Sequence, residues 1–315
     1  MTEYSPQISL APSPTLQTTV LGVKLRNPII VASGMLTDSL QQITKAVKAR
    51  AGAVVTKTIY SGKRGFATEE VCHIPTGTLN STTYSWRSLE QWLTDLSSLQ
   101  QMDLPIIVSI HAETPALLGD LAARVSDVCS FPLELGISCP NEVTYSILTP
   151  DIVLSYTSSV RRRVSVPISV KLSATETIRT LAEAALEGGA DALSLSDTLP
   201  ALQLERGSPR FLTGGAAGYS GSGIKPIVLH SLYNLRSSGI DCPILGIGGV
   251  ATLEDVLDYL YLGSSAVQMY TSLVHSGFKR INQLVDQLSD WCSQQQTTVE
   301  LQIGRALENG RKIDE

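Results

Sequence analysis

Residues 243–272 read PILGIGGVATLEDVLDYLYLGSSAVQMYTS, and this stretch carries the pattern that decides the fold. A short apolar run, 244–247, is followed by glycines and then by a segment of helical periodicity, for which Thr252 is a candidate N-cap. A second apolar run, 266–269, follows Gly263. Apolar runs of this length suit strands buried on both faces, so the stretch predicts a β-α-β unit with parallel strands.

The same pattern recurs along the chain of 315 residues. Eight apolar runs alternate with segments of helical periodicity, and no compositional break divides them. Eight such units, with no early GxGxxG motif, predict one closed (β/α)8 TIM barrel rather than an open doubly wound sheet. The predicted strands are 28–32, 53–57, 106–110, 133–137, 168–172, 192–196, 244–247 and 266–269.

The segments between the strands also contain helix signals. Asp151, Thr175 and Thr252 are candidate N-caps, and glycines after Glu187 and Leu262 stand where a helix end prefers a left-handed residue. The clearest apolar stripes predict helices at 117–128, 178–186 and 256–261.

We interpret residues 1–315 as a single barrel domain. Residues 1–26 form an N-terminal extension, in which the alternating stretch 18–25 predicts a small hairpin that closes the bottom of the barrel. Residues 293–315 form a C-terminal tail.

Bulk composition excludes several classes of function. The net charge of −5 gives no electrostatic footprint for nucleic acid. The absence of a run of about 18 apolar residues predicts no membrane span, and the first residues lack a signal-peptide pattern, so we expect a cytoplasmic protein. The five cysteines show no CxxC spacing, which argues against a disulfide framework, a structural zinc site or an iron–sulfur cluster.

Two long connections, 59–85 and 199–223, follow the second and sixth strands, at the end of a barrel where active sites are built. Several strands also end in polar residues there. Lysines are rarely buried unless they are paired, so Lys57 and Lys171, at the ends of apolar strands, together suggest an anionic or electron-rich ligand.

The glycines at 246–249, with Tyr270-Thr271-Ser272 after the last strand, predict a phosphate site, because glycine lets backbone N–H groups approach an anion closely. A further glycine cluster at 214–221 closes the long loop after strand six, where it can contact the same ligand. Cys139 follows the fourth strand and is a candidate general base. A Ser-His-Asp hydrolase is not supported, because the chain has no GxSxG motif.

These segments resemble the dihydroorotate dehydrogenases, particularly the soluble cytosolic type, over roughly residues 18–290. The motifs that carry the resemblance are NP at 27–28, ASG at 32–34, GAVVTKT at 52–58, GTLN at 77–80, SCPN at 138–141, VKLS at 170–173, GYSG at 218–221, IKP at 224–226, GIGG at 246–249 and AVQ at 266–268.

The resemblance implies FMN as cofactor and oxidation or reduction of a CH–CH bond, as in pyrimidine biosynthesis. Cys139 and Lys57 are the implied catalytic residues: Cys139 becomes the base, and Lys57 lies between flavin and substrate carboxylate. Lys171 approaches the N1/C2 side of the flavin ring. The implied cofactor-binding residues are Ala32, Ser33, Gly34, Lys57, Thr58, Lys171, Ser196, Gly221, Gly248, Gly249, Tyr270 and Thr271. The implied substrate-binding residues are Lys57, Asn80, Thr83, Tyr84, Gly136, Asn141, Asp197 and Thr198.

The substrate pocket departs from the family pattern. Gly136 and Asp197 stand where the family has asparagines, and TTYSW at 82–86 replaces a family stretch. An aspartate carboxylate only accepts hydrogen bonds, whereas an asparagine amide both donates and accepts. We therefore expect more space at Gly136, added aromatic surface from Tyr84 and Trp86, and a substrate that is dihydroorotate or a related small acid.

Other readings stay open at this point. A non-redox barrel, such as an aldolase or isomerase, would bind a phosphorylated ligand and form a Schiff base at Lys57 or Lys171. A catalytically silent barrel would only bind a ligand. We expect a small-molecule substrate, no metal, no nucleic acid, no membrane and a homodimer, as is common in the family; the electron acceptor is left open.

Overall fold

The computed structural model describes residues 14–62, 70–137, 141 and 147–310. Its centre is a closed parallel barrel with the strand order β4-β3-β15-β14-β11-β10-β9-β8, and pairing of β4 with β8 completes the circle. All eight predicted strands are confirmed, with small shifts at their ends. The barrel strands are β3 (Ile29–Val31), β4 (Ala53–Val55), β8 (Ile106–His111), β9 (Leu133–Gly136), β10 (Ile168–Leu172), β11 (Ala192–Leu195), β14 (Ile244–Ile247) and β15 (Ala266–Met269).

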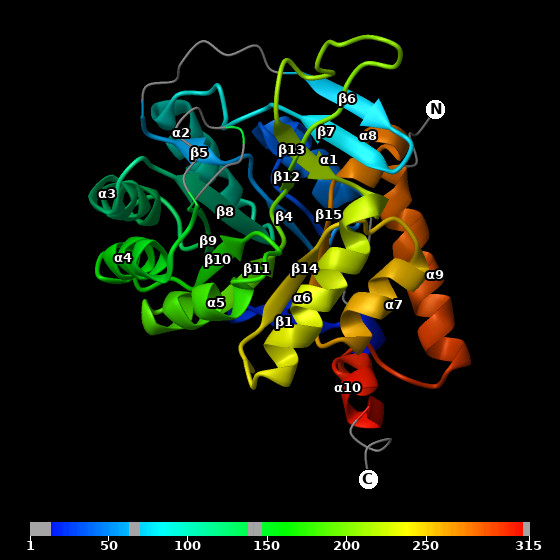
Figure 1. Ribbon diagram of the computed structural model, residues 1–315. Helices are drawn as coiled ribbons and strands as arrows, with labels where there is room; N and C mark the ends of the chain where they lie inside the picture. The colour runs from blue at the N-terminus through cyan, green and yellow to red at the C-terminus, as the bar shows by residue number, and fades with distance from the viewer. Residues whose placement is uncertain (1–13, 63–69, 138–140, 142–146, 311–315) are drawn as a thin grey trace, which may run out of the picture.

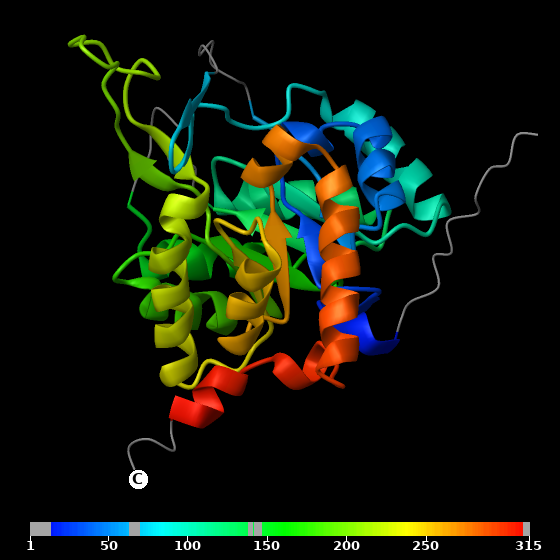
Figure 2. The same ribbon diagram turned by 90° about the vertical axis from the view of Figure 1, so that its right-hand side faces the viewer.

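Helices surround the barrel and cover the outer faces of its strands (Figures 1 and 2). Outward side chains such as Ile29 and Val31 join a core that includes the fully buried Trp92 of α2. The helices are α1 (Leu40–Lys48), α2 (Leu89–Gln101), α3 (Pro115–Ser126), α4 (Pro150–Arg161), α5 (Ile178–Glu187), α6 (Lys225–Ser237), α7 (Leu253–Tyr261), α8 (Thr271–Ser276), α9 (Lys279–Gln294) and α10 (Arg305–Gly310).

Helix starts confirm one predicted cap and correct two. Thr252 caps α7, and its hydroxyl accepts a hydrogen bond from the N–H of Asp255. The cap of α4 is Thr149 rather than Asp151, because Pro150 occupies the first helical position and places Asp151 inside the first turn. The cap position of α5 is Thr177, whose hydroxyl contacts that of Thr175.

A hairpin closes the bottom of the barrel, as predicted. Strands β1 (Thr18–Val20) and β2 (Val23–Leu25) pair antiparallel, and Val20 and Leu25 pack with inward residues of the barrel such as Ile30. The C-terminal segment is more structured than a tail, because α9 runs to Gln294 and α10 follows at this end of the molecule (Figure 1).

The two long connections form one structure at the top of the barrel. The first contains β5 (Ile59–Tyr60), β6 (Val71–Ile74) and β7 (Gly77–Asn80), and the second contains β12 (Leu199–Ala201) and β13 (Ala217–Ser220). β13 pairs antiparallel with β7, which gives a four-stranded sheet of order β12-β13-β7-β6 across the mouth (Figure 1). Within the described part of the chain, no helix is both long and apolar enough to cross a membrane.

Candidate active site

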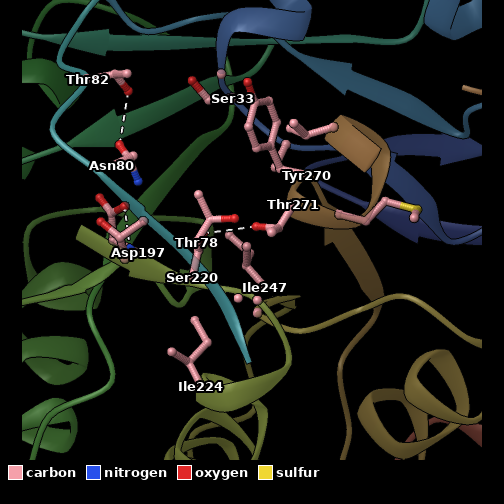
Figure 3. A pocket seen from close by; sticks show the side chains of 18 of the residues that line it. Ser33, Thr78, Asn80, Thr82, Asp197, Ser220, Ile224, Ile247, Tyr270 and Thr271 are labelled. Carbon is pink, nitrogen blue, oxygen red and sulfur yellow. Dashed lines mark hydrogen bonds between the residues drawn. The ribbon is translucent and has the colours of Figure 1, made fainter. Parts of the chain in front are cut away.

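A cavity of about 670 Å³ opens at the carboxyl ends of the barrel strands, beneath the four-stranded sheet. Every predicted site residue that the structure describes lines this cavity. They are Ala32, Ser33, Gly34, Lys57, Thr58, Asn80, Thr83, Tyr84, Gly136, Asn141, Lys171, Ser196, Asp197, Thr198, Gly221, Gly248, Gly249, Tyr270 and Thr271. Residues that are distant in sequence thus face one space, as Figure 3 shows for part of the set.

The order of the strands places two pairs of predicted site residues on opposite sides of the cavity. Lys57 follows β4 and Asp197 follows β11, and these strands lie four places apart in either direction around the eight-stranded circle, so the two side chains start from opposite sides. Gly136 ends β9, which lies opposite β15, the strand that leads to Tyr270 and Thr271. The predicted phosphate end and the Gly136 end therefore face each other across the barrel.

Lys171 lies between two carboxylates. Its Nζ is 3.8 Å from Oε1 of Glu134 and 3.8 Å from Oδ1 of Asp197. The Glu134 side chain has no exposed surface, whereas that of Lys171 is 13% exposed toward the cavity. Ser194 and Gln268 both donate to Oε2 of Glu134 at 2.7 Å. A buried carboxylate is costly unless it is paired, so Glu134 and Lys171 depend on each other within the barrel interior.

The glycine-rich end is shaped for a group that approaches the backbone. Gly248 and Gly249 have φ values of +131° and +71°, which side chains other than glycine rarely adopt. Among the described residues, neither of their N–H groups donates to a protein acceptor. Thr271 donates to the Ser220 hydroxyl at 2.9 Å, which brings two more hydroxyls to this end (Figure 3).

The ring of Tyr270 packs closely against the backbone of Gly34. A Cβ on Gly34 would lie 2.1 Å from the ring of Tyr270, so only glycine fits against this ring. Burial raises the pKa of Tyr270, because it disfavours the charged phenolate. Tyr270 therefore presents a neutral ring to the cavity at neutral pH.

The turn after Gly249 is held by an ion pair outside the cavity. Asp255 accepts hydrogen bonds from the N–H groups of Ala251 and Thr252 and from the ammonium of Lys225. Lys225 is also paired with Asp258 at 2.7 Å. Burial alone would raise the pKa of Asp255, but the Lys225 bond and the two N–H groups outweigh it and lower that pKa. Burial alone would lower the pKa of Lys225, but both aspartates outweigh it and raise that pKa.

The two asparagines of the predicted substrate site hold the long connections together. Asn141 donates to the carbonyl of Thr82 at 2.7 Å and to Oδ1 of Asn80 at 3.3 Å, and its own oxygen accepts from the N–H of Gly218 at 2.9 Å. Asn80 donates to the carbonyl of Gly218 and accepts from the Thr82 hydroxyl. Both amides therefore bridge β7, β13 and the segment after β9.

The predicted aromatic surface is present in part. Tyr84 lines the cavity and stacks on His111, with ring centroids 4.5 Å apart, and Tyr60 stacks on both rings, at 4.8 Å from Tyr84 and 5.7 Å from His111. Nδ1 of His111 lies 2.5 Å from the carbonyl oxygen of Gly136. Trp86 is 52% exposed and does not line the cavity, so that expectation is wrong.

Comparison with known proteins identifies the family. A family model described as "Dihydroorotate dehydrogenase" matches residues 15–291. The chain is 31% identical over 299 residues to a protein from Pyrococcus abyssi named "Dihydroorotate dehydrogenase B (NAD(+)), catalytic subunit", which covers 93% of this chain and 99% of the relative. The chain belongs to the dihydroorotate dehydrogenase family. It is therefore an oxidoreductase that acts on a CH–CH group.

Other members agree with this assignment. A protein of the same name from Geobacillus kaustophilus is 34% identical over 259 residues, which cover 80% of this chain and 82% of the relative. A crystal structure of DHODH from Eimeria tenella in complex with ferulenol superposes with a TM-score of 0.81 over 96% of this chain and 91% of the other. At 18% identity this likeness supports the barrel fold alone. Membership of this family argues against the aldolase or isomerase alternative and against a silent barrel.

Some cavity residues were not predicted. His73 of β6 and His275 of α8 line its rim with ring centroids 4.3 Å apart, and they meet because the sheet folds over the mouth, which is a long-range effect. Glu134, which is buried beside Lys171 and does not line the cavity, was also not predicted, although a charged residue inside an apolar strand signals a buried pair. Cys139, the predicted base, lies outside the described residues. Within the part that is described, no cluster of three His, Cys, Asp or Glu side chains could hold a metal ion.

Proposed function

We propose that this chain is an FMN-dependent dihydroorotate dehydrogenase-type enzyme. Its substrate is a small acid, dihydroorotate or a close relative, whose CH–CH bond it oxidises, or whose product it reduces. The observation that carries the proposal is the joint arrangement of Lys57, Lys171 and the glycine-rich turn in one cavity of a family member. Lys57 suits a carboxylate, Lys171 suits an anionic ring, and the glycine-rich turn suits a phosphate.

The cavity has features that fit FMN. The N–H groups of Gly248 and Gly249 have no protein acceptor among the described residues, and the hydroxyls of Ser220 and Thr271 lie at the same end. Gly34 leaves the backbone bare beside the Tyr270 ring, where a side chain would clash. These residues would hold the phosphate and the ring edge, and the bound flavin would supply the hydride acceptor or donor.

The chain's own groups would then orient and deprotonate the substrate. Lys57 is 5% exposed and faces the cavity, so it can bind the substrate carboxylate in a site that excludes most water. Lys171 would place positive charge beside the flavin ring. We propose that the thiolate of Cys139 removes the proton from the carbon next to the one that loses hydride, which stays a prediction from sequence.

Partners and location stay proposals. The relatives are named as catalytic subunits, which supports a partner subunit as electron acceptor. Fumarate, oxygen and a nicotinamide cofactor are the other candidate acceptors. We further propose a homodimer in the cytoplasm, as the sequence resemblance implies.

The test is an anaerobic titration of the purified protein with dihydroorotate, followed in the visible absorption of the flavin. We expect a yellow protein that bleaches on addition of the acid, and a Cys139→Ala variant that stays yellow and bleaches 10²- to 10⁴-fold more slowly. Cys242→Ser, at a half-buried position that does not line the cavity, is the matched control and should bleach normally. A colourless protein that takes up no FMN would contradict the proposal.

A further inference from the structure

Asp197 has an oxygen that the protein leaves available. Its Oδ1 accepts a hydrogen bond from the N–H of Thr198 at 2.7 Å and faces Lys171 at 3.8 Å. Among the described residues, no donor bonds to Oδ2, and the side chain lines the cavity with 22% of its surface exposed. A carboxylate oxygen can only accept hydrogen bonds, so a ligand that contacts it needs an N–H or O–H group.

Local charge favours the same kind of ligand group. Lys171 carries one formal positive charge between the carboxylates of Glu134 and Asp197, so this side of the cavity sums to one negative charge. Lys57 starts from the opposite side of the strand circle. A ligand that spans the cavity between them is bipolar, with an acidic group at Lys57 and a donor at Asp197.

The amides that could compete for this role are occupied. Both N–H groups of Asn141 donate within the protein, and Asn80 uses its oxygen twice and one N–H once. In Figure 3, Asn80 and Asp197 lie on the same side of the cavity, away from Tyr270 and Thr271. Among the amide and carboxylate oxygens of the described lining, Oδ2 of Asp197 is therefore the one to which no protein donor bonds.

The described lining of the cavity leaves room beside Gly136. Among the described residues, a Cβ built on Gly136 meets nothing closer than the carbonyl oxygen of Ile110 at 3.9 Å, whereas the same atom on Gly34 or Gly246 would clash. β9 pairs with β10 on one side, where Gly136 is level with Lys171, and with β8 on the other. The space therefore lies between the lysine and the His111–Tyr84 stack.

We propose that the substrate of this site is a carboxylic acid with an N–H donor at its far end, bound by Asp197, and a ring substituent on its flank, which fills the space beside Gly136. The inference rests on the proposed function, because it takes Lys57 as the carboxylate site. Asp197 and Gly136 are then the residues that determine specificity.

The donor is tested by methylating one nitrogen of a probe acid. In orotate, the ring nitrogen N3 lies across the ring from the carbon that bears the carboxylate. We expect 3-methylorotate to bind the wild-type holoenzyme at least about tenfold more weakly than orotate, and the Asp197→Ala variant less than about threefold more weakly, because a hydrogen bond to a charged group is lost only in the wild type. Dissociation constants come from calorimetry and from flavin difference spectra.

Two control variants protect this comparison. Asp241→Ala removes an exposed aspartate that does not line the cavity and should keep the wild-type preference. Asp197→Asn keeps one accepting oxygen, so it should fold and retain part of the preference if Asp197→Ala proves unstable. An equal penalty for methylation in wild type and in both Asp197 variants overturns the role of Asp197.

The space beside Gly136 is tested with acids that carry a methyl group on either flank, 1-methylorotate and 5-methylorotate. At least one should bind the wild type within about threefold of orotate, and Gly136→Val should weaken that one tenfold or more while orotate is less affected. Gly215→Ala, in an open turn, is the matched control. Rejection of both methylated acids by the wild type, or equal weakening of all acids by Gly136→Val, overturns this part.

These outcomes are separable from failure of the proposed function. A protein without bound FMN contradicts the cofactor, whatever the calorimetry shows. A yellow protein that dithionite bleaches, yet that binds none of the probe acids, leaves the cofactor standing and overturns the inferred substrate class.

Discussion

Replacing Lys171 with methionine tests how far Glu134 depends on its cation. Methionine keeps the length of the side chain and removes the charge, so the Glu134 carboxylate stays fully buried with only the bonds from Ser194 and Gln268. At 3.8 Å and an effective dielectric of about 20, the attraction that is lost amounts to about 4 kcal/mol. Breaking a buried pair by removing one partner typically costs about 3–5 kcal/mol, so we expect a loss of that size in the free energy of unfolding.

The assay is urea denaturation of the flavin-free protein, so that weaker cofactor binding does not enter the result. The double variant Lys171→Met/Glu134→Gln should recover most of the loss, because it leaves no unpaired charge in the barrel. A cost below about 1 kcal/mol, with no recovery in the double variant, would refute the dependence of Glu134 on Lys171.

Three further predictions concern Lys57, the turn at Gly249 and Asp255, which holds that turn. Lys57→Ala should raise KM for the acid more than it lowers kcat, measured by steady-state kinetics with Lys24→Ala as the exposed control; a selective loss of kcat would contradict a binding role. Gly249→Ala should weaken FMN binding, followed by flavin fluorescence, because its φ of +71° strains any side chain and its Cβ would meet Lys225; unchanged affinity would exclude the turn from the site. Asp255→Asn should destabilise the protein at neutral pH. Because the folded pKa of Asp255 is lowered, its contribution is complete above its ordinary value near 4 and is lost as the pH falls through the folded value, so urea midpoints of variant and wild type should converge only below about pH 4.

The sequence was sufficient for the barrel because its signals are local. Each buried strand is a continuous apolar run, such as Ile244–Ile247, and eight repeats of one unit leave few topologies to choose from. The cap of α7 was also readable, whereas Thr149 was missed because Pro150 shifts the start of α4 by two residues.

Part of the site could be predicted from strand ends and part from the family resemblance. Lys57 and Asp197 follow from counting strands, since the carboxyl ends of parallel strands share one face of the barrel, whereas Asn80, Tyr84 and Gly136 came from the resemblance. The pairing of β7 with β13 was not predictable, because it joins residues about 140 positions apart through backbone bonds that carry no local sequence pattern. Asn80 and Asn141 hydrogen-bond to Gly218 of β13, which that pairing brings close, so the sequence did not predict that they hold the two connections together.

The sheet formed by β12, β13, β7 and β6 also constrains how this protein can change. Because Asn80 and Asn141 bond across the β7–β13 junction, the two connections cannot be exchanged independently. A chimaera that takes only one connection from a relative would carry one of the two strands that form the β7–β13 pairing. The sheet across the mouth of the barrel would then pair incorrectly, even if every barrel strand were retained. Substrate preference in this lineage should therefore be transplanted, by evolution or in the laboratory, as a matched pair of segments.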